Sequence, residues 1–220
     1  MTKFKPFTTT LIGSLPRTKE LLLLKESSNN SSKYEKAYKE KLLEETRKVV
    51  ELQKECGIDV IVSGELNRDN YMSYVAEVVD GIKLLNMEEV MSLTNNTDNF
   101  SKSLEEMDAA DDTMNSPICF SKLDTKKRLN DFEFGILKEL VDGDIKCTLP
   151  SPYLLTRSMW LKEVTGKVYD GRRELGEDVV ELLCNEIREL VGSGAKIIQI
   201  DEPILSEVVF TNEKADNSFY

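Results

Sequence analysis

Polar side chains follow several apolar runs in this sequence, and they are the groups best placed to bind a ligand. The runs end at Gly13-Ser14, at Glu65, at Ser151 and at Asp201-Glu202. A glycine lets the backbone approach a ligand closely, so Gly13 and Ser14 could offer N–H groups and a hydroxyl to a carboxylate. The alternative interpretation of this pair is a tight turn between a strand and a helix.

Two of these positions place carboxylates at strand ends. Glu65 suits the recognition of a substrate ammonium group, although an ion pair with Arg68 would use the same carboxylate. Asp201 and Glu202 follow the run Ile197-Ile-Gln-Ile200. Because side chains alternate along a strand, one of these acids can enter a site while the other supports it or meets solvent. A solvated strand end is the alternative, which the apolar character of the run disfavours.

The sequence contains no histidine, the commonest general base and metal ligand. Ser-His-Asp and Cys-His catalysis are therefore excluded for this chain. The cysteines lie far apart with no Cys-x-x-Cys pair, which indicates reduced core thiols rather than a disulfide framework or a local zinc site. They are Cys56, Cys119, Cys147 and Cys184. Any chemistry of this chain must use carboxylates, thiols, lysines or backbone groups.

Charge and hydropathy exclude two further classes of partner. The 220 residues carry 40 acidic and 29 basic side chains, and the net charge of −11 repels nucleic-acid phosphates. No apolar run approaches the ~20 residues that span a bilayer, and no secretory signal begins the chain, so we expect a cytoplasmic protein. Residues 84–115 hold eight of the acids against one lysine, which predicts a solvated acidic insertion with one or two short helices. The length and the 40% hydrophobic content favour one domain over residues 1–220.

The same order of elements occurs three times along the chain. Amphipathic helices predicted over residues 33–56, 132–141 and 175–191 each end at a glycine, and an apolar strand with a polar end follows each one. These strands start near Asp59, Ile145 and Lys196. Before the first repeat we expect a strand from Thr8, a short helix over 19–25 and a loop over 27–32.

Strands that alternate with helices predict an α/β fold with parallel pairing. A doubly wound sheet would carry a glycine-rich phosphate loop, and neither Gly-x-Gly-x-x-Gly nor Gly-x-x-x-x-Gly-Lys-Ser/Thr occurs. A (β/α)8 barrel places functional groups at the carboxyl ends of several strands, as this sequence does. Four strands in place of eight predict about the first four βα units, a partial barrel.

Four stretches, in order, resemble the catalytic domain of the cobalamin-independent methionine synthases. Thr8-Thr-Thr-Leu-Ile-Gly-Ser-Leu-Pro-Arg-Thr18 is similar to the opening strand of that family, and Ser63-Gly-Glu65 is similar to its Gly-Glu strand end. Leu149-Pro-Ser-Pro-Tyr153 is similar to its Thr-Gly-Pro turn, and Ile198-Gln-Ile-Asp-Glu-Pro203 to its Gln-Ile-Asp-Glu-Pro motif. The stretches cover essentially the whole chain, and their order is more specific than any one of them.

The resemblance implies a methyltransferase barrel in which a zinc-bound homocysteine thiolate accepts a methyl group from a folate or, in some relatives, from a corrinoid protein. It implies that the backbone at Ile12, Gly13 and Ser14 binds the carboxylate of the amino acid. It implies that Glu65 and Asp201 hold the ammonium group.

The resemblance also bears on the methyl donor and the metal. Glu207 matches a family acid near the pterin. The aromatic residue that stacks on folate has Ser158 in the nearest place, with Trp160 two residues further on. The zinc ligands of the family, a His-x-Cys pair, a glutamate and a distal cysteine, have no counterpart in this chain, so we expect the amino-terminal half of a longer barrel.

Two other functions fit parts of the sequence. One is a half-barrel that binds an amino acid or a partner without catalysis and covers its open sheet edges in a homo-oligomer. The other is an enzyme like uroporphyrinogen decarboxylase, which shares the barrel. Its arginine-rich pocket is represented here only by Arg17, and the acidic composition disfavours it.

Overall fold

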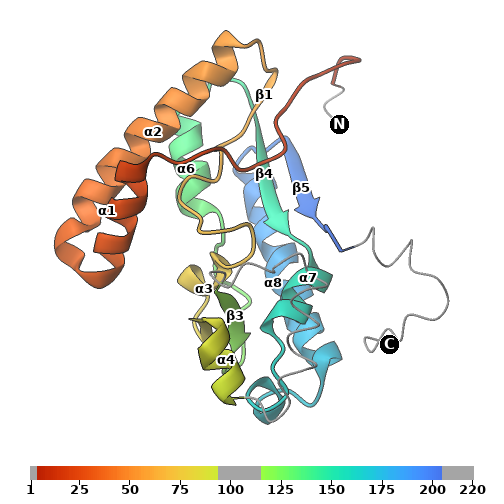
Figure 1. Cartoon of the computed structure of the whole chain (residues 1–220). Helices are drawn as coiled ribbons and strands as arrows, with labels where there is room; N and C mark the ends of the chain where they lie inside the picture. Colours follow the sequence, from red (N-terminus) through yellow and green to blue (C-terminus); the bar gives the residue numbers. More distant parts are fainter. Residues whose placement is uncertain (1–3, 94–114, 205–220) are drawn as a thin grey trace.

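A parallel sheet runs through the middle of the computed structural model, which describes residues 4–93 and 115–204 (Figure 1). Its strands are β1 (Val60–Ile61), β4 (Asp144–Pro150) and β5 (Ile197–Asp201), in the order β1-β4-β5. Both pairings are parallel, with Val60 opposite Asp144 and Lys146 opposite Ile197. The three strands predicted from the helix-glycine-strand repeats are therefore present and adjacent in chain order.

The strand predicted from Thr8 is wrong in its extent. Thr10 forms one isolated parallel bridge with Val60, where the Val60 N–H donates to the carbonyl of Thr9. Further along, side chains take the place of ladder bonds, because the carbonyls of Leu11 and Ile12 accept hydrogen bonds from the Lys146 ammonium group. The segment still lies beside β1 and extends the parallel order by one position.

Strand β4 separates an apolar face from a polar one. Ile145, Cys147 and Leu149 are buried in the main hydrophobic core. Lys146 and Thr148 alternate with them and are equally buried, but their partners are polar groups. The period of two along a strand thus directs one set of side chains toward the helices and the other toward the ends of neighbouring strands.

Two long helices match the predicted ones closely. α2 (Glu35–Glu55) precedes β1, and α8 (Arg172–Gly192) precedes β5, behind the sheet in Figure 1. α8 buries a stripe at helical spacing that includes Leu175, Val179 and Leu182. Gly57 and Gly194, at φ of 73° and 109°, occupy the left-handed region that lets the chain leave each helix.

The loop predicted over residues 27–32 is partly wrong. Helix α1 (Lys19–Asn30) continues through the serine and asparagine cluster and pairs with α2, and the 3-10 turn η1 (Ser32–Tyr34) joins them. The hydroxyls of Ser27 and Ser28 and the amide of Asn30 donate to backbone carbonyls one turn earlier. Serine and asparagine side chains disfavour the interior of a helix, and these bonds satisfy their polar groups within α1.

Other helices complete the sheet's cover. α6 (Asp131–Leu140) precedes β4, and α7 (Pro152–Met159) follows it and packs on α8. The 3-10 turn η2 (Thr165–Lys167) lies between α7 and α8. Ser151, expected at a turn, caps α7 by accepting from the Leu154 N–H, and Pro152 takes the first helical position, where no donor is needed. None of the helices in residues 4–93 and 115–204 is long and apolar enough to cross a bilayer.

The acidic segment 84–115 begins in an antiparallel hairpin that the sequence did not predict. β2 (Ile82–Leu85) pairs with β3 (Ser116–Cys119). In the sequence, the short helix α3 (Val75–Val78) precedes β2, and α4 (Met87–Leu93) lies between the two strands. Val90 of α4 is fully buried against Ile118 and Leu161 in a small separate cluster. The remainder of the predicted insertion, residues 94–114, lies outside the described residues.

Candidate functional site

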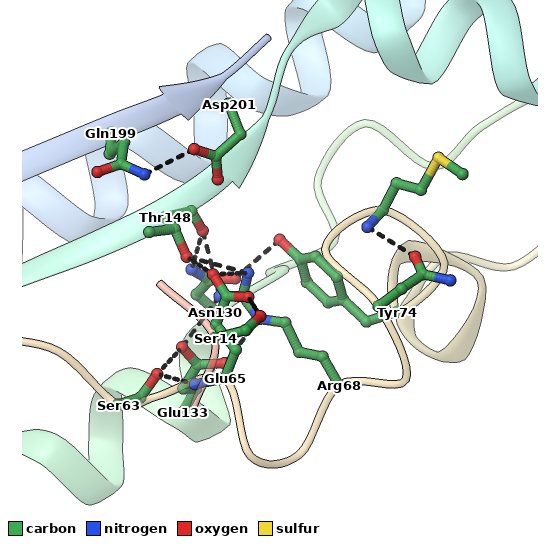
Figure 2. A network of polar contacts seen from close by, with 12 residues as sticks. Ser14, Ser63, Glu65, Arg68, Tyr74, Asn130, Glu133, Thr148, Gln199 and Asp201 are labelled. Atoms are coloured by element: carbon green, nitrogen blue, oxygen red, sulfur yellow. Dashed lines mark hydrogen bonds and ion pairs between the residues drawn. The ribbon is translucent and has the colours of Figure 1, made fainter. Parts of the chain in front are cut away.

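Glu65 is the centre of a buried polar cluster at the carboxyl end of β1 (Figure 2). Its side chain accepts from the hydroxyls of Ser14 and Thr148, each at 2.5 Å, on its two oxygens. These donors come from residues 8–14, called the Thr10 segment, and from β4. One carboxylate thus joins this segment to the carboxyl ends of β1 and β4. Only 3% of Glu65 is exposed.

The backbone at Glu65 is in an unusual conformation. Glu65 has a φ of 54° and follows Gly64 at 74°. A non-glycine residue in the left-handed region costs of order 1 kcal/mol and persists where the surroundings hold it. Here the Glu65 N–H donates to the hydroxyl of Ser63 and Arg17 donates to the Glu65 carbonyl. The turn thus aims the carboxylate back across the ends of the strands.

Arg68 lies between the carboxylates of Glu65 and Glu133. Its side chain is inaccessible to solvent and makes two bonds of 2.9 Å to the carboxylate of Glu133, on α6. The same guanidinium group lies 3.4 Å from Glu65 and 3.1 Å from the hydroxyl of Thr148, and it stacks on the ring of Tyr74 at 4.3 Å. The ion pair predicted with Glu65 exists, but Glu133 is the closer partner.

A third buried acid, Glu186, connects the cluster to α8. Glu186 of α8 is fully buried and accepts from the backbone N–H groups of Leu129 and Asn130, just before α6. The Asn130 amide then donates to the Thr148 carbonyl and accepts from the hydroxyl of Tyr74. The carboxyl end of β4 is therefore connected to α6 and α8 through paired polar groups, as buried polar networks require.

Asp201 lies at the carboxyl end of β5, beside this cluster. Its carboxylate accepts from the side-chain amide of Gln199, two residues earlier on the same face, at 2.6 Å. Burial raises the pKa of Asp201 above its usual value, the amide of Gln199 lowers it, and the carboxylate of Glu65 raises it. The carboxylates of Asp201 and Glu65 thus face a shared region, and a cationic group bound there would stabilise their ionised forms.

Glu202 points elsewhere, as the alternation of side chains predicts. It accepts from the hydroxyl of Ser151 and, at 3.2 Å, from the N–H of Ile204. Glu202 therefore supports the turn after β5, while Asp201 is the member of the pair that faces the cluster.

The backbone at Ile12, Gly13 and Ser14 forms the other side of the site. Gly13 is buried so closely against Glu65 that a Cβ atom at position 13 would lie 2.8 Å from the Glu65 Oε1. Within the described part of the chain, the N–H groups of residues 12–14 donate no hydrogen bond, whereas the N–H of Leu15 bonds Gly64. The side chain of Ile12 is 82% exposed, so only its backbone belongs to the site.

The two residues predicted to bind the methyl donor stay a prediction. Trp160 ends α7 and is half-buried against the main core, and Glu207 lies outside the described residues. Sequence reasoning missed Lys146, Thr148 and Glu133. The available signal was the alternation on β4, where a lysine and a threonine interrupt an apolar run at the period of a strand.

The two buried thiols, Cys119 and Cys147, are poor nucleophiles, and the described residues form no metal centre. Burial raises the pKa of Cys119 to about 11 and that of Cys147 to about 12, which keeps both as neutral thiols. Among residues 4–93 and 115–204, no three His, Cys, Asp or Glu side chains gather where they could hold a metal ion.

A parallel α/β domain with polar groups gathered at the carboxyl ends of adjacent strands defines a class of small-molecule-binding domains. A sequence model described as "Cobalamin-independent synthase, Catalytic domain" matches residues 7–220. The chain belongs to this family, and the resemblance drawn from its motifs is confirmed.

Named relatives agree with this assignment. A 5-methyltetrahydropteroyltriglutamate–homocysteine methyltransferase of Coxiella burnetii is 25% identical over 201 residues, 91% of this chain and 23% of the relative. One from Thermodesulfovibrio yellowstonii is 28% identical over 206 residues, 93% of this chain and 25% of the relative. The chain thus spans about a quarter of the length of these curated relatives.

Solved structures share the fold. A putative vitamin-B12-independent methionine synthase from Listeria monocytogenes superposes with a TM-score of 0.64 at 20% identity, over 98% of this chain and 57% of that protein. A B12-independent methionine synthase from Shewanella sp. W3-18-1, solved with selenomethionine, gives 0.56 at 19% identity, over 77% of this chain and 43% of that protein.

Proposed function

We propose that this chain forms the amino-acid-binding part of a methyltransferase that moves a methyl group to a homocysteine-type thiol, on a partial (β/α)8 barrel. The observation that carries the proposal is the meeting of residues 8–14 with the carboxyl ends of β1 and β4 at Glu65, with Asp201 facing the same region. Membership of the synthase family and the methyltransferase names of its relatives support the reaction class.

An α-amino acid fits the charges of this site. Its carboxylate would accept from the backbone N–H groups of residues 12–14, where Gly13 allows close approach. Its ammonium group would pair with Glu65 and Asp201, whose mutual repulsion a positive charge relieves. Held at both ends, the amino acid would direct its sulfur-bearing side chain in one defined direction, and this fixed orientation is the chain's contribution to methyl transfer.

Zinc, which the family resemblance implies, does not fit the described residues. The chain has no histidine, its four cysteines form no disulfide, and burial keeps Cys119 and Cys147 as neutral thiols. A zinc ion that activates the thiol would need ligands from outside residues 4–93 and 115–204. In this proposal the chain's own residues bind and orient the amino acid.

The methyl donor is a folate or a corrinoid protein in this proposal. Trp160 and Glu207 remain the residues that the family resemblance assigns to the donor. The names of the relatives specify a pteroyltriglutamate donor for those proteins. Measuring methyl transfer from each donor class to homocysteine in the presence of this chain distinguishes the two.

A second candidate function is amino-acid binding without turnover. The absence of histidine and of a metal-binding group in the described residues favours it. The two functions make the same prediction for ligand binding and differ in methyl transfer, so a chain that binds methionine but gives no transfer with either donor supports the second.

Calorimetry with methionine tests the shared claim. We expect saturable binding of methionine to the wild-type chain. The affinity of Glu65→Gln for methionine should be lower by about tenfold or more, because a charged partner of the ammonium group is lost. The deaminated analogue 4-(methylthio)butanoate should bind both chains equally weakly. Glu139→Gln, an exposed acid on α6, serves as the matched control. Equal affinities of methionine for Glu65→Gln and the wild type would overturn the proposal.

A further inference from the structure

Lys146 is a buried lysine that joins two segments which do not pair with each other. It lies on β4 with 4% of its surface exposed. Its ammonium group donates to the carbonyl of Leu11, to the carbonyl of Ile12 at 3.1 Å, and to the side-chain carbonyl of Gln199 at 2.6 Å. All three donors of a lysine are thereby used, and none of the acceptors is a carboxylate.

The first two bonds fix the direction of two peptide groups. In a trans peptide the C=O and the following N–H point in opposite directions. With the carbonyls of Leu11 and Ile12 turned toward Lys146, the N–H groups of Ile12 and Gly13 point away from it. These are two of the groups that donate no hydrogen bond in the described part of the chain. A positive charge on the carbonyl side also polarises the peptide, which strengthens its N–H as a donor to an anion.

The third bond fixes the orientation of Gln199. Because the carbonyl oxygen of this amide accepts from Lys146, its nitrogen must face the other way, and it donates to Asp201 at 2.6 Å. A single ammonium group thus orients backbone donors on the Thr10 segment and a carboxylate on β5. The two halves of the proposed amino-acid site meet at Lys146.

We propose that Lys146 is a positioning residue that holds the carboxylate-binding N–H groups of residues 12–13 and the ammonium-binding carboxylate of Asp201 in a fixed relation to each other. The proposal rests on the proposed amino-acid site. It adds a specificity device, because a ligand must carry its anionic and cationic groups at the separation that Lys146 sets.

The charge of Lys146 is part of the device. Burial lowers the pKa of its ammonium group, while the carboxylates of Asp201 and Glu65 raise it. Asp201 in turn is faced by Lys146, Gln199, Glu65 and Arg68. A neutral side chain of similar length at position 146 would fill the space but orient neither partner.

A ligand-free experiment tests the device independently of the proposed function. In Lys146→Met, NMR titration should show the pKa of the Asp201 carboxyl group moved upward, because a nearby positive charge is lost. The amide resonances of Ile12 and Gly13 should shift or broaden as their peptide groups lose orientation. Lys196→Met, which replaces an exposed lysine just before β5, should leave both unchanged. Unchanged Asp201 titration and amide signals in a folded Lys146→Met chain would overturn the inference.

Ligand binding gives a second test with a different pattern for each variant. Gln199→Leu removes the bond to Asp201 and one acceptor of Lys146, but it keeps the bonds from Lys146 to the carbonyls of Leu11 and Ile12. The affinity for methionine should therefore fall about tenfold while that for 4-(methylthio)butanoate is unchanged. Lys146→Met should weaken both ligands about tenfold or more, because the carboxylate-binding N–H groups also lose orientation. Equal losses for both ligands in both variants would indicate a general structural effect and overturn the inference. If the wild-type chain binds no methionine, the proposed function fails, and the ligand-free titration still decides the role of Lys146.

Discussion

Removing the carboxylate of Glu133 should destabilise the chain severely, because it leaves Arg68 charged and buried. The Arg68 side chain is inaccessible to solvent, and Glu133 supplies its two 2.9 Å bonds. In Glu133→Ala the guanidinium group keeps only Thr148, the 3.4 Å contact with Glu65 and the ring of Tyr74. An arginine cannot escape by losing its proton.

The expected loss follows from known costs of such changes. Breaking a buried ion pair by removing one partner costs about 3–5 kcal/mol. Ser63 also loses the carboxylate oxygen to which its hydroxyl donates at 2.5 Å. For a chain of this length, each kcal/mol lowers the melting temperature by roughly 2–4 °C, so we expect a fall of roughly 6–20 °C. Replacing both partners, in Arg68→Met with Glu133→Leu, should cost less than Glu133→Ala alone.

Guanidinium denaturation provides the assay. Trp160 is the single tryptophan and is half-buried against the main core, so its fluorescence reports on unfolding. Glu139→Ala removes an exposed acid from the same helix and should change the free energy of unfolding by less than about 0.5 kcal/mol. If Glu133→Ala behaves like Glu139→Ala, Arg68 does not depend on Glu133 and the description of the cluster is wrong.

Three further changes test other parts of the structure. Gly13→Ala should weaken methionine binding and cost about 1–3 kcal/mol of stability, because its Cβ would lie 2.8 Å from the Glu65 carboxylate; unchanged calorimetry and melting would contradict this. Asp201→Asn should lose methionine affinity yet melt at an equal or higher temperature at neutral pH. The raised pKa of Asp201 means that its contribution to stability is present at low pH and lost as pH rises through that pKa, so a less stable variant at neutral pH would refute the reasoning. Asp59, whose pKa is lowered by hydrogen bonds from Thr9, should stabilise the fold above its unfolded pKa and lose this effect as pH falls through the folded value. The difference in melting temperature between the wild type and Asp59→Asn should therefore shrink in acid, and a constant difference would argue against it.

Local signals were enough to predict the repeated helix-strand units. Glycines such as Gly57 and Gly194 adopt the left-handed conformation that ends a helix, and an apolar strand begins shortly after each. The hairpin of β2 and β3 escaped prediction because its two strands are joined by a long polar segment, without the short turn that marks a hairpin. Helix α7 was missed because Pro152 indicates a turn, yet a proline also suits the first position of a helix.

The sequence predicted the site residues that follow a local pattern and missed those that depend on distant partners. Ser14, Glu65 and Asp201 follow apolar runs in the sequence, so each was visible as a strand end. Lys146 and Glu133 acquire their roles only through partners far away along the chain: Leu11 and Gln199 for the lysine, Arg68 for the glutamate. Long-range pairing of this kind leaves no local pattern, and the structure was needed to identify it.

The most direct test of the amino-acid site is the pH dependence of methionine binding measured by calorimetry. The site requires Glu65 and Asp201 to be ionised when they hold the ammonium group. Because the pKa of Asp201 is raised, affinity should weaken as pH falls through that pKa, at a higher pH than for an ordinary aspartate. In Asp201→Asn the affinity should be lower at neutral pH and flat across the same range. Methionine binding that is equally tight in both chains and independent of pH would contradict the account.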